Sequence, residues 1–129
     1  MSMKDHFVVF DFETNSFRGG LPVLHPQHHI VQVCMAARMG TFQAHVKPPL
    51  HIPTLSSTIH RVTDETVQGA DAFPKVWEAM LSWLGSVRQG RNVRQRLFLV
   101  AHNAHGFDAP LLRKELAACG HVVPPWISF

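Results

Sequence analysis

Two acidic side chains follow an apolar run near the start of the chain. Asp11 and Glu13 are separated by one residue at the end of residues 7–13, which are otherwise apolar. In a strand, residues two positions apart leave the same face with their Cα atoms about 7 Å apart, so both carboxylates can reach one cation. Two carboxylates that repel each other and lose hydration destabilise the fold unless a cation compensates. The pair therefore indicates a metal site or, if the strand has already reached the surface, two solvated side chains.

A third carboxylate, Asp108, lies between an apolar run and a helical pattern. Residues 97–101 are typical of a strand buried on both faces, and residues 109–119 are expected to form a helix that Asp108 opens and Gly120 closes. An Asp at this position is often only a helix N-cap. In an α/β sheet, however, ligands gather at the carboxyl ends of strands, where Asp108 and the Asp11/Glu13 pair are both predicted to lie.

The remaining patterns predict the elements that position these side chains. Strands are expected at residues 7–13, 30–38 and 42–47, the last half-solvated, with a loop between the first two. Residues 50–72 are expected to be mostly irregular apart from a short helix near residue 64, and an amphipathic helix follows over residues 73–84. A basic loop spans residues 88–96, and a last strand begins within residues 122–129. This order predicts an α/β fold of the ribonuclease H-like class, with a mixed central sheet flanked by helices.

Composition narrows the class of protein. The chain has 129 residues, 46% of them hydrophobic and 16% charged, which suits one domain over residues 1–129. The two cysteines, Cys34 and Cys119, are too few for a disulfide framework or a CxxC zinc site. No apolar run approaches the roughly 20 residues of a membrane span, so a soluble, intracellular protein without membrane contact is expected. A formal net charge of +3 permits a polyanionic partner such as nucleic acid.

Histidines are abundant and raise the question of a zinc cluster. The chain has ten, and His25, His28 and His29 lie close together in the sequence. His28 and His29 enter an apolar strand, where neighbouring side chains point to opposite faces, so the pair cannot converge on one ion. A histidine-based metal site is therefore disfavoured.

At the carboxylates the chain resembles the DnaQ-like (DEDD, DEDDh-type) 3′→5′ exonucleases. Phe10-Asp11-Phe12-Glu13-Thr14 is similar to the first family motif, Asp-x-Glu-Thr at the end of the first strand. Ala101-His102-Asn103 followed by Phe107-Asp108 is similar to the second motif, with one more intervening residue than in proofreading subunits, as in the TREX branch. Ser57, Ile59-His60 and residues 62–65 resemble the segment that precedes the first helix in these enzymes.

The resemblance implies a nucleic-acid-binding domain built for two-metal phosphodiester hydrolysis, with two Mg²⁺ or Mn²⁺ ions. It implies that Asp11 bridges the ions, that Glu13 binds the nucleophile-side ion and that Asp108 binds the leaving-group-side ion. It also implies that Thr14, His102 and Asn103 contact the nucleic acid, and the basic loop adds Arg91 and Arg94 as expected contacts. The expected partner is a single-stranded 3′ end, and no residue distinguishes DNA from RNA.

The third family motif is missing. That motif is a His followed five residues later by an Asp on a helix after the last strand, whereas no Asp follows Asp108 and the only later histidine is His121. Neither His105 nor His121 falls on an element that could be placed beside the carboxylates. The resemblance thus implies a domain truncated at its C terminus and weak or inactive by itself, since loss of a general base typically costs about 10²- to 10⁴-fold in rate.

Three interpretations remain open at the level of sequence. The chain is a shortened version of an active nuclease, a degenerate exonuclease fold that binds nucleic acid or protein without cutting, or an unrelated interaction domain. In the first two, a missing final helix would leave one face of the sheet bare. Because bare apolar surface tends to recruit a partner or a second copy, a homodimer is among the expected assemblies.

Overall fold

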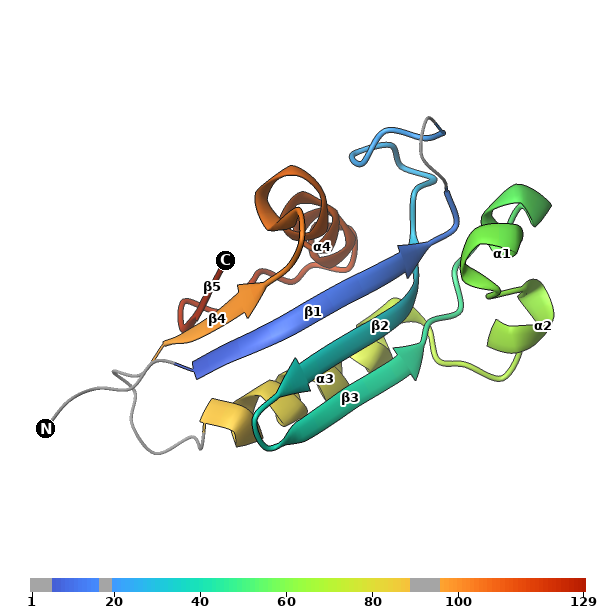
Figure 1. The fold of residues 1–129 in the computed structure, drawn as a ribbon. Helices are drawn as coiled ribbons and strands as arrows, with labels where there is room; N and C mark the ends of the chain where they lie inside the picture. Colours follow the sequence, from blue (N-terminus) through green and yellow to red (C-terminus); the bar gives the residue numbers. More distant parts are fainter. Residues whose placement is uncertain (1–5, 17–19, 89–95) are drawn as a thin grey trace, which may run out of the picture.

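A computed structural model describes residues 6–16, 20–88 and 96–129. They include a mixed five-stranded sheet with the strand order β3-β2-β1-β4-β5 (Figure 1). β1 (His6–Thr14), β2 (Ile30–Ala37) and β3 (Gly40–His45) form an antiparallel meander. β4 (Leu97–Val100) pairs parallel with β1, and β5 (Ile127–Ser128) pairs parallel with β4. The predicted α/β fold of the ribonuclease H-like class is confirmed, and β5 lies within the residues where a last strand was expected to begin.

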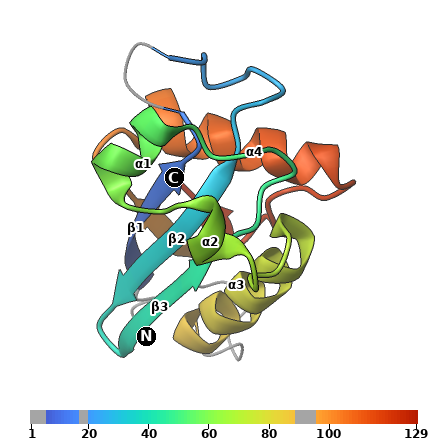
Figure 2. The same cartoon turned by 90° about the vertical axis from the view of Figure 1, so that its right-hand side faces the viewer.

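Two amphipathic helices, α3 (Phe73–Arg88) and α4 (Ala109–Ala118), cover one face of this sheet (Figure 2). Their apolar sides and alternate residues of the strands form the main core, which includes Val8, Phe10, Phe12, Trp77, Met80, Leu84, Leu111, Leu112 and Leu116. Two guanidinium groups pack on aromatic rings of the C-terminal segment: Arg88 lies 4.8 Å from the ring centre of Trp126, and Arg113 lies 5.0 Å from that of Phe129. Both helices were predicted. α4 ends within one residue of its expected position, whereas α3 continues to Arg88, the first residue of the segment expected to be a basic loop.

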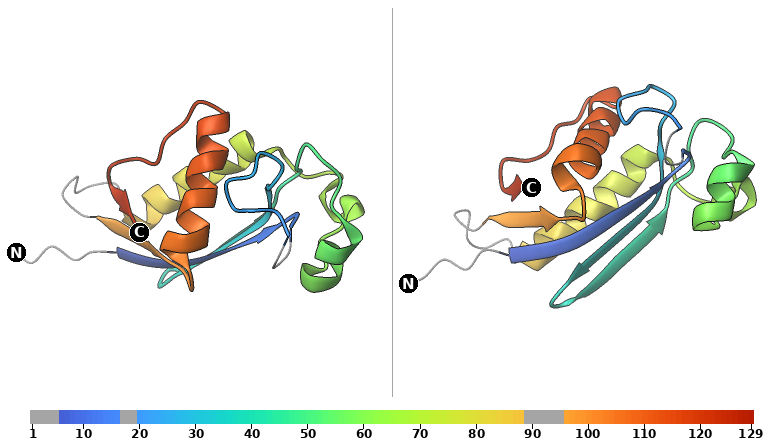
Figure 3. Two further views of the ribbon diagram at one scale, coloured as in Figure 1. Left: turned by 90° about the horizontal axis from the view of Figure 1, so that it is seen from above. Right: turned by 45° about the horizontal axis from the view of Figure 1, so that its top comes forward.

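Two short helices, α1 (Thr54–His60) and α2 (Asp64–Val67), lie beyond the ends of β1 and β3 (Figure 3). α2 was predicted, but α1 corrects the expectation of an irregular segment there. Its N-cap, Pro53, makes no side-chain cap hydrogen bond, and it ends at Arg61 with φ 62°, so neither end carries a usual sequence signal. A small second core of Val31, Ile52, Val62 and Val67 lies beneath both helices.

The opposite face of the sheet carries no covering element among the described residues. Phe7 and Val9 on β1 are 64% and 60% exposed, and Val100 on β4 is 45% exposed. Phe7 stacks on Phe98 with 5.5 Å between ring centroids. The expectation that β4 is buried on both faces was therefore wrong. Apolar side chains make a face of a strand suitable for burial, but burial also requires another element that packs on that face. Asp11 and Glu13 share this open face with Phe7 and Val9.

Two further expectations concern the cysteines and the membrane. Both cysteines are free and half-buried, so neither belongs to the fully buried core. Over the described ranges, no helix combines the length and apolar character that a membrane crossing requires.

Candidate active site

The parallel pairing of β1 and β4 brings three carboxylates toward one region of the sheet. Asp11 is exposed and Glu13 is half-buried, both near the carboxyl end of β1. β4 pairs with β1 as far as the Val9/Val100 contact, so the chain that leaves β4 passes beside Asp11 before it reaches Asp108. Asp108 thus follows the carboxyl end of β4, the strand that pairs parallel with β1, and a joint role of the three carboxylates stays a prediction.

Asp108 has the most perturbed environment of the three. It is only 5% exposed and occupies the N-cap position of α4, yet its side chain makes no cap hydrogen bond. Burial and the negative charge of Asp11 raise the pKa of Asp108 to about 6, while its own backbone N–H and the charge of His102 act in the opposite direction. Helix capping, the ordinary explanation for an Asp at this position, does not account for this side chain.

Glu13 is coupled to the same neighbour. Burial and the charge of Asp11 raise the pKa of Glu13, whereas His60 lowers it. Asp11 therefore acts on both of the other carboxylates, which places all three in one electrostatic neighbourhood. Their oxygen donors suit Mg²⁺ or Mn²⁺ chemically. Within residues 6–16, 20–88 and 96–129, no three His, Cys, Asp or Glu side chains converge closely enough to hold an ion as they stand. A shared ion at Asp11, Glu13 and Asp108 thus stays a prediction.

The second motif is held in a π-helical turn, η1 (Ala104–Asp108). The N–H of Asp108 donates to the carbonyl of Asn103 over 3.3 Å, and the N–H of Ala109 donates to that of Ala104. Since a π turn contains one residue more than an α turn, it accommodates the additional residue noted between Asn103 and Asp108. A Cβ on Gly106 would lie 2.6 Å from Oδ1 of Asn103, so a glycine there leaves room for that amide.

The predicted nucleic-acid contacts fall in different places. His102 and Asn103 are exposed just before the π turn, and their role is untested. Arg91 and Arg94 lie outside the described residues. Thr14 is buried and lines a pocket, and its contact with nucleic acid stays a prediction.

This pocket adjoins the carboxylates and has a volume of about 570 Å³. That size falls within the roughly 300–1,000 Å³ of sites for small molecules. The end of β1, the loop of residues 20–28, α1 and the π turn supply its walls, which include Glu13, Thr14, Leu21, His28, Ile59, His60 and Phe107. Because Glu13 belongs both to the pocket and to the carboxylate group, a ligand in the pocket would lie next to the three acids.

Thr14 connects three sides of the pocket. Its carbonyl accepts a hydrogen bond from Nε2 of His60 over 2.6 Å, and its hydroxyl accepts one from the backbone N–H of Ser16 over 3.2 Å. Nε2 of His28 lies 2.9 Å from the same hydroxyl, and Nδ1 lies 3.1 Å from the carbonyl of Pro22. Since that carbonyl can only accept, neutral His28 carries its proton on Nδ1 and donates it to the carbonyl, and its Nε2 accepts a hydrogen bond from the Thr14 hydroxyl. Burial lowers the pKa of His28, which favours this neutral form.

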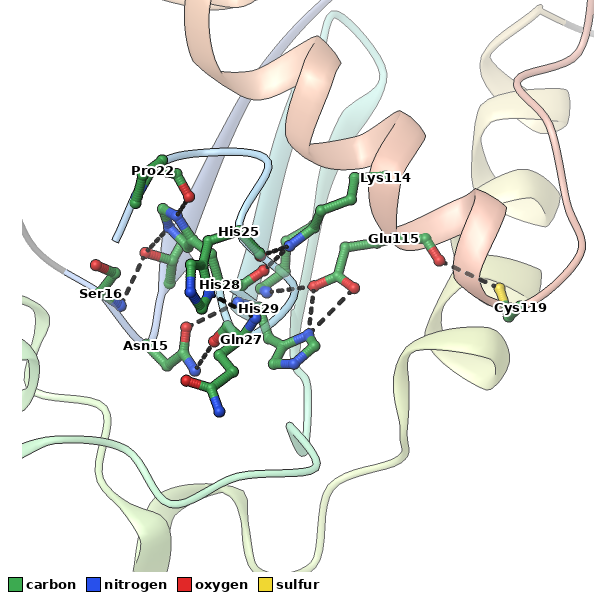
Figure 4. A network of polar contacts seen from close by, with 12 residues as sticks. Asn15, Ser16, Pro22, His25, Gln27, His28, His29, Lys114, Glu115 and Cys119 are labelled. Atoms are coloured by element: carbon green, nitrogen blue, oxygen red, sulfur yellow. Dashed lines mark hydrogen bonds and ion pairs between the residues drawn. The ribbon is translucent and has the colours of Figure 1, made fainter. Parts of the chain in front are cut away.

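Two residues of α4, Lys114 and Glu115, bind the C-terminal part of the loop of residues 20–28 and the residues that follow it (Figure 4). Nζ of Lys114 donates to the carbonyl of His25 over 2.9 Å and also to the carbonyl of His28. Glu115, only 7% exposed, accepts from the N–H of Ile30 over 3.0 Å and lies 3.1 Å from Nδ1 of His29. The rings of His28 and His29 thus have separate partners. The roles of Lys114 and Glu115 were missed, since their partners lie more than 80 positions away in sequence.

Comparisons with known proteins agree with this geometry. The family model described as Exonuclease (RNase_T) matches residues 8–128. The fold is similar to the nuclease domain of 3′hExo, a DEDDh family member, bound to rAMP, with a TM-score of 0.73 at 20% identity over 95% of this chain and 63% of that one. No curated protein sequence matches the chain.

Two further solved structures are similar. One shows 3′-end specific recognition of a histone mRNA stem-loop by 3′-exonuclease, with a TM-score of 0.65 and 19% identity over 87% of this chain and 42% of that one. The other is a full-length 3′-exonuclease, with a TM-score of 0.59 and 22% identity over 76% of this chain and 34% of that one. The chain therefore spans less than two thirds of each of these structures, and at such identities the likeness shows the fold alone.

Proposed function

Because this chain belongs to the exonuclease (RNase_T) family, we propose that it is the carboxylate-bearing part of a metal-dependent 3′→5′ exonuclease that acts on nucleic acid. Membership of the DnaQ-like superfamily, predicted from the two motifs, is confirmed, and the TREX-like branch stays a prediction. Since the chain spans 63% of the 3′hExo nuclease domain, the substrate and the activity of the whole protein are part of the proposal.

The environment of Asp108 carries the proposal. This carboxylate is buried at a helix N terminus, beside Asp11, without the cap hydrogen bond that would explain it structurally. Gathering like charges in a partly dehydrated place destabilises a fold, and a divalent cation relieves that repulsion. Binding of a hard cation by their carboxylate oxygens would account for the proximity of Asp11, Glu13 and Asp108.

Asp11, Glu13 and Asp108 would hold two Mg²⁺ ions, which when bound polarise the scissile phosphate and activate water for attack on it. The other residues bind and orient. Thr14 and His28 shape the pocket where the 3′-terminal nucleoside would sit, and Glu13 joins that pocket to the acids. A nucleotide in the pocket would thereby present its phosphodiester to the carboxylates. The rAMP bound to the similar 3′hExo domain makes adenosine 5′-monophosphate (AMP) a suitable probe.

A second candidate is a domain that binds 3′ ends without cutting them. It is favoured by the exposed positions of His105 and His121, the two histidines considered as replacements for the general base of the third motif. His60 acts electrostatically on Glu13, and His102 acts on Asp108, but neither histidine belongs to the third family motif. This candidate predicts AMP and oligonucleotide binding with no measurable turnover.

Digestion of a 3′-tailed oligonucleotide by the purified chain, with Mg²⁺ or Mn²⁺, distinguishes the two. The first candidate predicts slow, metal-dependent shortening from the 3′ end that Asp11→Ala abolishes. Metal-dependent binding of the oligonucleotide without shortening would favour the second. If the chain neither binds nor shortens the oligonucleotide, both candidates are wrong.

A further inference from the structure

We propose that Lys114 is a positioning residue for the nucleotide pocket: it ties the loop of residues 20–29 to α4 and so holds the outer wall of the pocket in place relative to Asp108. The inference rests on the proposed function, since it takes this pocket to be the seat of the 3′-terminal nucleoside. Lys114 is not among the residues that line the pocket, so it acts through the loop.

The loop forms the outer wall and has a defined internal structure. It contributes Gly20, Leu21, Pro22, Val23 and His28 to the pocket. Oγ of Ser16 accepts from the N–H of Leu21 over 2.8 Å, and the His28 ring bridges the Pro22 carbonyl and the Thr14 hydroxyl. At the base of the loop, the Asn15 side chain donates to the Gln27 carbonyl over 2.8 Å and accepts from the N–H of His29 over 2.7 Å. These bonds all lie within residues 14–29, so they shape the loop without fixing its angle to α4.

The contacts from α4 fix that angle, and Lys114 makes the contact nearest the middle of the loop (Figure 4). The Glu115 carboxylate binds His29 and Ile30, where the chain is already entering β2. Lys114 reaches further, because its ammonium group donates to the carbonyls of both His25 and His28. Two other contacts hold the loop on either side of His25: Val23 packs against the main core, and the His28 ring lies 5.8 Å, between centroids, from that of Phe107 in the π turn before α4. Neither of them is a hydrogen bond to α4.

The same helix also determines where Asp108 lies. α4 begins directly after Asp108, and Lys114 follows about 9 Å further along the helix axis. A rigid helix therefore joins a proposed metal ligand at its start to a pocket wall at its second turn. If Lys114 is lost, the wall can take several angles relative to the carboxylates, and a nucleotide must then order the loop when it binds.

The alternative is that Lys114 only satisfies two carbonyl groups and stabilises the fold. That alternative predicts a lower free energy of unfolding and an unchanged affinity of the folded protein for nucleotide. A positioning role predicts weaker nucleotide binding, unchanged binding of metal alone, and recovery when another long cationic donor occupies the position. The two are separable because the pocket and the carboxylates can be probed with different ligands.

The experiment is calorimetric titration with AMP in the presence of Mn²⁺, and with Mn²⁺ alone, for the wild type, Lys114→Met, Lys114→Arg and Lys75→Met. Lys75 is an exposed residue of α3, so its replacement removes the same charge away from the pocket. Lys114→Met is expected to bind AMP about tenfold more weakly, because AMP must then supply the free energy of ordering the loop, which is of the order of one hydrogen bond from a charged donor. Its Mn²⁺ affinity should equal that of the wild type. Lys114→Arg should recover most of the AMP affinity, and Lys75→Met should match the wild type.

Each other outcome has a definite meaning. Equal AMP affinity in the wild type and folded Lys114→Met overturns the inference and leaves the proposed function intact. Failure of the wild type to bind AMP contradicts the proposed pocket itself. Loss of Mn²⁺ binding in Lys114→Met, or no recovery in Lys114→Arg, shows a general structural role and also overturns the inference. If the Met variant does not fold, Lys114→Gln replaces it, with the same AMP and Mn²⁺ results expected of a neutral side chain.

Discussion

Replacing Asp108 by Asn should stabilise the metal-free protein, although Asp108 is a proposed metal ligand. Burial and the charge of Asp11 hold the pKa of Asp108 at about 6, against an ordinary value of 3.8. At neutral pH the folded state therefore carries an ionised carboxylate that the unfolded state accommodates better. Asn has nearly the same shape and no charge, so the variant removes this penalty without opening a cavity.

The size and the sign follow from linkage. A rise of about two pKa units corresponds to about 3 kcal/mol of differential stability. Because the folded state holds the proton more tightly, the stabilisation from protonation is fully present below pH 3.8 and is lost as the pH rises through about 6. Partial access of the carboxylate to water reduces the effect, so Asp108→Asn should gain about 1–3 kcal/mol at pH 7.5. The gain should shrink toward zero as the pH falls to 3.8.

Urea denaturation in the presence of a chelator, between pH 4.5 and 8, measures this difference. The titration of groups that do not interact with Asp108 cancels in the difference between variant and wild type, and Asp71→Asn, at an exposed position, is the matched control. Excess Mn²⁺ should reverse the order, because only the wild type retains all three carboxylates. Equal stability of Asp108→Asn and wild type at pH 7.5, or a pH-independent loss in the variant, would refute the claim of an uncompensated buried charge.

Three further predictions use the same protein. Gly106→Ala should displace the Asn103 amide, whose Oδ1 would lie 2.6 Å from the new Cβ, and lower stability by about 1 kcal/mol in urea denaturation. Gly85→Ala, with nothing within 4 Å in α3, should instead raise it by about 0.5–1 kcal/mol. Burial lowers the pKa of His28, so below pH 6.5 this imidazole is protonated more readily in the unfolded state than in the folded state. The difference in free energy of unfolding between the wild type and His28→Gln should therefore become smaller as the pH falls. Single-stranded oligonucleotide binding should weaken steeply with salt, less so after Arg91→Ala and Arg94→Ala, whereas a flat response in fluorescence anisotropy would exclude phosphate contacts.

Much of the fold could be predicted from local patterns. The alternation in β1, the apolar run of β4 and the helical spacing in α3 report directly on burial of one face, which tertiary packing then satisfies. Covering of the second face could not be predicted in this way. Phe7 and Val9 have the composition of buried residues but are exposed, because burial depends on whether another element packs there. α1 was missed because its Ser and Thr residues and its left-handed end at Arg61 lack helical signals.

The candidate site was predictable only in part. The spacing of Asp11 and Glu13, and the position of Asp108 after a strand, are local and were sufficient to place the carboxylates near each other. The pocket is different, because its walls combine the end of β1, a loop, α1 and the π turn. The Lys114 side chain and the His25 carbonyl that it binds are 89 positions apart in the sequence. Because every residue carries a backbone carbonyl, no pattern of side chains could have predicted this acceptor. The existence of the contact follows from the packing of α4 against the loop.

Titration of the metal-free protein with Mn²⁺ tests the central claim most directly, because it does not depend on the missing motif or on turnover. The comparison includes the wild type, Asp11→Asn, Glu13→Gln and Asp108→Asn, with Asp71→Asn as the control of equal charge change. Binding by the wild type and the control that weakens at least tenfold in each of the other three is the predicted result, by analogy with losing a charged ligand group. Absence of Mn²⁺ binding by the folded wild type, or binding that all four variants retain, would contradict the assignment of these carboxylates as one metal site.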